Sequence, residues 1–229
     1  KKKVAVQIHD LLMQLQHRGQ DAAGIITANE RFNIKIGQGL VKDIFTQDDM
    51  ANLNGNLGLG HVRYPTSGSL ASDETQPFWI GSPYGIAMAH NGQLTNYEKL
   101  AEYLKKEKRR HLNTKSDSET LIHLLASSLE DQGGDVDTDE GFFAQLEKAI
   151  RNLMLNAQGS YSVVCSIIGK GLVAFRDPHG IRPLVMGERE EDGGDKSYVI
   201  ASENAGFYAL GYEQVEDILP GELVFISLD

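Results

Sequence analysis

The stretch SPYGIAMAHNGQLTN, residues 82–96, lies where the chain changes from strand patterns to helix patterns, and it decides the fold class. Residues 84–90 are dense in apolar and small side chains, which is typical of a buried strand. Thr95 and Glu98 have the spacing of a helix capping box, and the apolar residues after them recur at helical intervals. A strand followed closely by an amphipathic helix is therefore expected here.

Strand patterns flank a group of helices in the middle of the chain. We expect helices over 97–104, 116–129 and 142–153, and a first helix over 8–15. Strands are expected at 22–28, 31–36, 56–64, 160–168, 172–176, 184–187, 198–202 and 222–227. This order predicts an α+β domain with antiparallel sheets, not a doubly wound parallel sheet. The 229 residues fit one large domain, residues 1–229.

The composition is that of an acidic globular domain. Lys and Arg total 22 against 32 Asp and Glu, a net charge of −10, which argues against nucleic acid or an anionic membrane as partner. No apolar run approaches the roughly 18 residues of a membrane span, and no signal peptide is recognisable. The single cysteine, Cys165, excludes an internal disulfide and a Cys-rich metal site, so a reducing cytoplasm is the expected location. Its apolar neighbours predict a buried, inert thiol.

Three short polar sites interrupt otherwise structural segments. Arg63, in GHVRYPTSG (60–68), is either part of a surface ion pair or a clamp for a carboxylate, which a guanidinium fork fits well. Asn91-Gly92 is either a hairpin turn or an oxyanion hole made of a side-chain amide and a backbone N–H. Asp117, in SDSE (116–119), either belongs to a capped helix start or binds an ammonium group.

The three sites indicate a function only when they are considered together. Taken singly, each favours its structural explanation, because caps and turns are common. Together they provide an anion clamp, an oxyanion hole and a cation clamp, which an enzyme needs to hold an amino acid and hydrolyse its side-chain amide. We therefore expect them to converge on one cavity.

The same sites, in the same order, occur in a known family. The chain resembles the class II glutamine amidotransferase domain, an N-terminal-nucleophile hydrolase, and RYPTSG and FRDPHGIRPL point to its amidophosphoribosyltransferase branch. The resemblance covers essentially the whole chain. The matching stretches are QHRGQDAAGI (16–25), GHVRYPTSG (60–68), SPYGIAMAHNGQLTN (82–96), NTKSDSE (113–119), AFRDPHGIRPLVMG (174–187) and ASEN (201–204).

The resemblance implies a four-layer αββα sandwich of two antiparallel sheets and hydrolysis of glutamine to glutamate and ammonia through a cysteinyl thioester. It implies that Arg63 holds the α-carboxylate of glutamine, that Asp117 holds the α-amino group, and that Asn91 and Gly92 stabilise the oxyanion. Thr66 and Ser67 would line the glutamine pocket, and Arg18 would shape the surroundings of the nucleophile. In this branch the ammonia forms phosphoribosylamine in de novo purine synthesis.

The resemblance also implies features outside the 229 residues. The family nucleophile is a cysteine at the mature N-terminus, on a short strand ahead of the first helix, and the expectation is that this strand is missing here. A truncated start and a true variant that binds glutamine without cleaving it both explain this, and the intact binding positions favour truncation. The family continues into a phosphoribosyltransferase domain, for which magnesium is expected, whereas the glutaminase domain needs no metal or other cofactor.

The family forms homo-oligomers (tetramers). Two other interpretations stay open, namely the glutaminase domain of a different amidotransferase and a non-catalytic glutamine-binding module.

Overall fold

The helices and strands follow the order that the sequence predicts. The structure, a computed structural model, describes residues 4–64, 74–132 and 137–228. The helices are α1 (Ala5–Gln14), α2 (Val41–Ile44), α3 (Gln47–Asn52), α4 (Tyr97–Lys106), α5 (Asp117–Glu130) and α6 (Asp139–Asn156), with 3₁₀ turns η1 (Gln16–Arg18) and η2 (Tyr208–Leu210). The strands are β1 (Ala22–Ala28), β2 (Phe32–Gln38), β3 (Leu57–Arg63), β4 (Phe78–Ile80), β5 (Ile86–Leu94), β6 (Gly159–Ile167), β7 (Gly171–Arg176), β8 (Val185–Glu190), β9 (Lys196–Ala201), β10 (Glu213–Asp217) and β11 (Leu223–Ser227).

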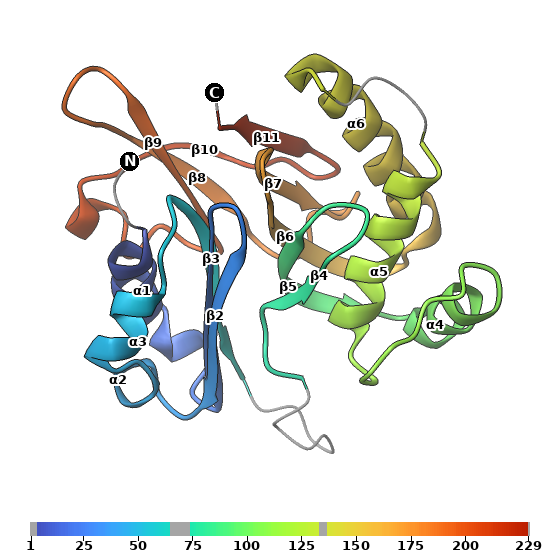
Figure 1. Ribbon diagram of the computed structural model, residues 1–229, viewed down its shortest axis with the longest axis horizontal. Coiled ribbons are helices and arrows are strands. Elements are labelled where there is room, and N and C mark those ends of the chain that lie inside the picture. Colours follow the sequence, from blue (N-terminus) through green and yellow to red (C-terminus); the bar gives the residue numbers. More distant parts are fainter. Residues whose placement is uncertain (1–3, 65–73, 133–136, 229) are drawn as a thin grey trace.

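The described strands form antiparallel sheets in a layered arrangement (Figure 1). One sheet has the order β2-β1-β3 and a larger one the order β11-β7-β6-β5-β4. Helices α1 and α2 pack on the outer face of the first sheet, and α4, α5 and α6 pack on the outer face of the second. Between the sheets lies an apolar layer that includes Ile26, Leu59, Ala87 and Ala89. The four-layer αββα sandwich is therefore confirmed.

The number of sheets differs from the expectation of two. A third sheet in the described part of the chain has the order β10-β8-β9. Leu184 and Ile200 pack with Val164 and Ala174, so this small sheet covers the inner face of the five-stranded sheet, as β3 does. It therefore shares a layer with β2-β1-β3 without hydrogen-bonding to it.

The sequence predicted the positions of the helices and strands more accurately than the residues that cap the helices. The strand expected at 22–28 is β1, residue for residue. The capping box of Thr95 and Glu98 is wrong, because the N-cap of α4 is Asn96, whose side chain bonds the chain at the end of α6 instead. Ser116 does cap α5, but Glu119 does not complete a box there. At the start of α4, a long-range contact of Asn96 has therefore replaced the local cap.

Several short helices and strands have no counterpart among the expected elements. The short helices α2 and α3 and the strands β4 and β10 were not expected. Within the described residues, no helix is both long and apolar enough to cross a membrane.

Candidate active site

Arg63 is the last residue of β3, and its side chain is buried among acidic groups. Nη1 lies 2.6 Å from a carboxylate oxygen of Asp21, and Nη2 lies 2.9 Å from one of Glu74. The backbone N–H of Asp21 donates to the carbonyl of Arg63. A Cβ on Gly19 would lie only 2.5 Å from the carbonyl carbon of Arg63. The glycine of the QHRGQD stretch therefore lets that turn pack directly against Arg63. A carboxylate partner for this guanidinium was expected from the sequence, but Asp21 and Glu74 were not predicted as partners.

Asp117 is the first residue of α5, where the positive end of the helix dipole favours a carboxylate. Its Oδ2 accepts the backbone N–H of Leu94 at 2.9 Å, and Ser118 Oγ donates to Oδ1 at 3.4 Å. The side chain keeps 22% exposure, so a ligand can still reach it. These contacts fix the carboxylate beside β5.

Asn91 and Gly92 lie within β5, so the hairpin-turn interpretation is wrong. They pair with Ser162 and Tyr161 of β6. Gly92 has φ +154°, and a Cβ there would lie 2.1 Å from the carbonyl oxygen of Ser160. No other residue fits this backbone without strain. The pair is thus a distorted point in a central strand, next to Asp117.

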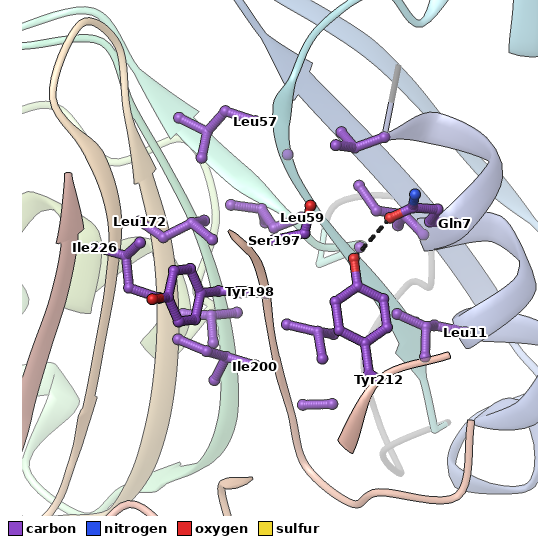
Figure 2. Close-up of a pocket in the computed structure, with 18 of the residues that line it drawn as sticks. Gln7, Leu11, Leu57, Leu59, Leu172, Ser197, Tyr198, Ile200, Tyr212 and Ile226 are labelled. Atoms are coloured by element: carbon purple, nitrogen blue, oxygen red, sulfur yellow. Dashed lines mark hydrogen bonds between the residues drawn. The ribbon is translucent and has the colours of Figure 1, made fainter. Parts of the chain in front are cut away.

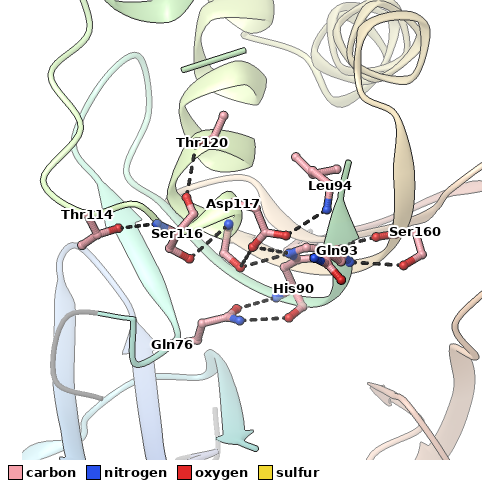
Figure 3. A network of polar contacts seen from close by, with 10 residues as sticks. Gln76, His90, Gln93, Leu94, Thr114, Ser116, Asp117, Thr120 and Ser160 are labelled. Carbon is pink, nitrogen blue, oxygen red and sulfur yellow. Dashed lines mark hydrogen bonds and ion pairs between the residues drawn. The ribbon is translucent and has the colours of Figure 1, made fainter. Parts of the chain in front are cut away.

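His90 connects β5 to the start of α5 (Figure 3). Its Nδ1 lies 3.0 Å from Ser118 Oγ and 3.9 Å from Asp117 Oδ1, and its Nε2 lies 3.4 Å from the carbonyl of Ser160. Gln76 holds its backbone, since Oε1 accepts the His90 N–H at 2.7 Å and Nε2 donates to its carbonyl at 3.0 Å. Burial lowers the pKa of His90, although Asp117 opposes the shift. Burial therefore favours the neutral form of the imidazole.

Glu119 holds the loop that leads into Asp117. Its buried carboxylate accepts the backbone N–H and side-chain groups of Asn113 and Thr114 at 2.6–3.1 Å. Burial alone would raise the pKa of Glu119, and these hydrogen bonds outweigh it, so the pKa lies below its usual value. The sequence places Glu119 in a capped helix start and gives no sign that it anchors the preceding loop.

The three expected sites gather in one region. Arg63 contacts Glu74, two residues before Gln76, and Gln76 binds the strand that carries Asn91. Asp117 contacts the same strand directly, through the backbone N–H of Leu94.

Arg18 lies near the same region. Its Nη1 is 3.2 Å from Glu203, which also contacts His17 Nε2 at 2.8 Å. Arg18 and Asn91 line one cavity together with His61. Burial lowers the pKa of His61 to about 4, and the neighbouring His90 and Arg63 add to the effect.

Two expected residues, Thr66 and Ser67, lie outside the described residues. Cys165 is buried in β6 and burial raises the pKa of its thiol, as expected for a core residue. Among the described residues, no three His, Cys, Asp or Glu side chains gather where they could hold a metal ion.

The sandwich and the polar residues along β5 and the start of α5 are those expected of a glutamine amidotransferase domain. The family described as "Glutamine amidotransferase domain" matches residues 61–209, and the chain belongs to this family. The amidophosphoribosyltransferase of Escherichia coli (strain K12) is 49% identical over 222 residues, which are 96% of this chain and 43% of that protein.

Solved structures show the same relationship. A structure described as the allosteric regulatory enzyme of purine biosynthesis has a TM-score of 0.81 at 29% identity, over 98% of this chain and 44% of that one. The glutamine phosphoribosylpyrophosphate amidotransferase from B. subtilis, complexed with ADP and GMP, has a TM-score of 0.79 at 29% identity, over 99% of this chain and 45% of that one. The chain thus spans less than half the length of these three relatives.

Proposed function

We propose that this chain is the glutaminase part of an amidophosphoribosyltransferase, which hydrolyses glutamine to glutamate and ammonia for phosphoribosylamine formation. The proposal is supported by the family of the chain, by Asp117 bound to the strand that carries Asn91-Gly92, and by Arg63, which reaches the same strand through Glu74 and Gln76. A glutamine zwitterion needs one fixed cation and one fixed anion at its α-carbon, and paired donors above its amide.

The proposed reaction passes through a thioester. A cysteine thiol attacks the amide carbon of glutamine, while Asn91 Nδ2 and the Gly92 N–H donate to the oxygen that becomes negative. The carbon–nitrogen bond then breaks, ammonia leaves with the thiol proton, and water hydrolyses the thioester to glutamate. The only cysteine of the 229 residues is buried in β6, so the proposed thiol belongs to a segment outside them.

Arg63 must exchange partners when glutamine binds. Its guanidinium already contacts two carboxylates, and a third in the same place would meet net negative charge. Asp21 is tied into the adjacent turn through its backbone N–H, whereas Glu74 follows the segment that contains Thr66 and Ser67. We propose that the substrate carboxylate displaces Glu74, and that Thr66 and Ser67 line the glutamine pocket. Arg18 would then shape the site from the cavity side.

The whole protein would contain a phosphoribosyltransferase domain, with magnesium as its expected metal, and would assemble as a homo-tetramer in the cytoplasm. The names of the relatives and the share of their length that this chain covers support the second domain. The single cysteine supports a reducing compartment.

The test uses the full-length protein that contains this chain. Incubated with glutamine and phosphoribosyl pyrophosphate, it is expected to release glutamate and pyrophosphate in equal amounts. Equal glutamate release with fructose 6-phosphate would instead indicate another amidotransferase. Calorimetric binding of glutamine without any glutamate release would indicate a non-catalytic module. Modification of Cys165 serves as a control, because a buried thiol should react with maleimide only after unfolding.

A further inference from the structure

The carboxylate of Asp177 has no part in the proposed reaction, yet it holds the strand that lies beside Asn91-Gly92. Asp177 directly follows β7 and is fully buried. Its Oδ2 accepts the backbone N–H of Tyr161 at 3.1 Å, and its own backbone N–H donates to the carbonyl of Tyr161 at 2.8 Å. Both backbone polar groups of Tyr161 are therefore bound by this one residue.

Tyr161 lies directly opposite Gly92 in the pairing of β6 with β5. In an antiparallel pair, the N–H and C=O of one residue point to the same side of its strand. Those of Tyr161 point to Asp177, so the residue opposite Gly92 does not bind the Gly92 N–H. An N–H that its opposite residue leaves unused is what the proposed oxyanion hole requires.

The position of Tyr161 also determines how closely β6 approaches Gly92. The carbonyl of the preceding residue, Ser160, is so near that a Cβ on Gly92 would lie 2.1 Å from its oxygen. The ring of Tyr161 is fully buried against Phe175, with the two ring centroids 6.2 Å apart. With its ring and its backbone both fixed, Tyr161 fixes the backbone of Gly92 in turn.

The turn that follows Asp177 holds the next residue of β6 as well. The carboxylate of Asp177 accepts the backbone N–H groups of His179 at 2.9 Å and Ile181 at 3.2 Å, which sets the shape of the turn. The carbonyl of Arg182 then accepts a hydrogen bond from the hydroxyl of Ser162 at 2.7 Å. One turn therefore holds two successive residues of β6.

Ser162 lies opposite Asn91 in the same pairing. Side chains directly opposite each other on paired strands lie on one face of the sheet and contact each other. Both side chains line a cavity of about 980 Å³, and Figure 2 shows the apolar part of its wall, which includes Leu59 and Ile200. The Ser162 side chain therefore supports the Asn91 amide from the neighbouring strand.

Other parts of the chain hold the groups that bind the α-carbon of glutamine in the proposed function. Arg63 is held by Asp21 and Glu74, and Asp117 by the backbone N–H of Leu94. A disturbance of the turn at 177–182 is therefore expected to affect the amide end of bound glutamine and to spare its α-carbon end.

We propose that Asp177 is a positioning residue for the hydrolysis of glutamine. Its carboxylate holds the part of β6 that faces Asn91 and Gly92, and so aligns the two proposed oxyanion donors. The inference rests on the proposed function of that pair. Since the donors act on charge that develops only during the reaction, loss of the carboxylate lowers kcat and leaves the KM of glutamine nearly unchanged.

The first test compares two buried substitutions in the full-length protein that contains this chain. Asp177→Asn keeps the size of the side chain but presents an NH₂ group to backbone N–H donors. Because loss of a whole oxyanion donor costs about 10²–10³ in kcat, its displacement is expected to lower kcat about tenfold or more, with KM within about twofold. The control, Gln145→Leu, removes buried hydrogen bonds to the carbonyls of Leu129 and Gln132 at the other end of α5 and should keep kcat.

The kcat is taken per active site, so that a loss of folded protein does not imitate a loss of alignment. A chloroketone analogue of glutamine, which alkylates a thiol in the glutamine site, counts the active sites by its final stoichiometry. A merely structural function of Asp177 would lower this count and leave kcat per active site unchanged.

A milder pair of substitutions keeps the test decisive if Asp177→Asn does not fold. Ser162→Ala removes only the hydrogen bond to the carbonyl of Arg182 and should lower kcat per active site about threefold or more, at unchanged KM. Ser166→Ala is its matched control on the same strand, because this buried hydroxyl has no hydrogen-bond partner in the described part of the chain. It should leave both constants unchanged.

Hydrogen exchange of the backbone amides of residues 91–93 tests the support of the corner without any activity. Asp177→Asn is expected to speed this exchange about tenfold or more, and Gln145→Leu to leave it unchanged. Where Asp177→Asn does not fold, Ser162→Ala and Ser166→Ala are compared in the same way.

The outcomes separate this proposal from the proposed function. A parent protein that releases glutamate, with Asp177→Asn equal to Gln145→Leu in kcat per active site, overturns only the positioning by Asp177. A rise in KM as large as the fall in kcat also overturns it, because the α-carbon end would then be affected. A parent protein that releases no glutamate contradicts the proposed function, and exchange at 91–93 then decides whether Asp177 holds the corner: faster exchange supports this and unchanged exchange overturns it.

Discussion

Replacing Asp117 by Asn separates the charge of this side chain from its structural contacts. The Asn side-chain oxygen can still accept the Leu94 N–H, which now bonds Asp117 Oδ2 at 2.9 Å. The change therefore removes the negative charge while the start of α5 keeps its anchor to β5. The loss of a carboxylate at a helix N-terminus costs about 0.5 kcal/mol of folding stability, which leaves the chain folded.

The effect on glutamine is expected to be larger. A hydrogen bond to a charged group contributes about 1.5–3 kcal/mol, and the 22% exposure of Asp117 puts this pair in the middle of that range. About 2 kcal/mol corresponds to a rise in the Kd of glutamine of about 30-fold. Calorimetry with the 229-residue chain measures it. Glutaramate, which has the amide and a carboxylate but lacks the α-amino group, provides the reference ligand.

The comparison of the two ligands decides the outcome. If Asp117 binds the α-ammonium group, the substitution weakens glutamine and leaves glutaramate unchanged. Equal weakening of both ligands would mean that Asp117 only shapes the site. An unchanged Kd for glutamine would refute the assigned contact altogether.

Three further changes test neighbouring parts of the site. Gly92→Ala puts a Cβ 2.1 Å from the carbonyl of Ser160 at φ +154°, so urea unfolding should show a loss of about 3 kcal/mol, and a loss below about 1 kcal/mol would contradict the strain argument. Glu74→Gln removes a competitor for Arg63 and should lower the Kd of glutamine about fivefold in calorimetry, whereas weaker binding would show that Glu74 positions the guanidinium instead. The pKa of His61 is about 4 when folded and 6.5 when unfolded, so the unfolded state binds more protons between these values. Stability should therefore fall by up to about 1.4 kcal/mol per unit as pH drops through this window; His61→Gln should flatten that slope, and an unchanged slope would count against burial of the imidazole.

The fold class could be predicted because its signals are local. The seven apolar and small residues of β1 predicted a buried strand, and all seven are buried. Cys165 was placed in a core strand by its apolar neighbours, and it is fully buried in β6. The stretches that carry the family resemblance also provided the candidate site residues, which stay a prediction.

The arrangement of the site could not be predicted in the same way. The dipeptide Asn-Gly favours a turn locally, yet it lies inside β5, because its pairing with β6 stabilises the strand more than the local preference opposes it. The partners of Arg63 come from residues 42 and 11 positions away. Gln76 has no pattern of its own that distinguishes it from any other glutamine.

The sequence by itself determined an antiparallel α+β domain, a buried and unreactive cysteine, and the residue types for binding both ends of an amino acid. Periodicity, composition and short motifs carry this information because each depends on residues close together in the chain. Only the tertiary structure decided that Arg63 is held by two carboxylates, that His90 connects β5 to α5, and that β3 and β9 belong to separate sheets. These features depend on which distant surfaces meet when the layers pack, and no local pattern specifies that.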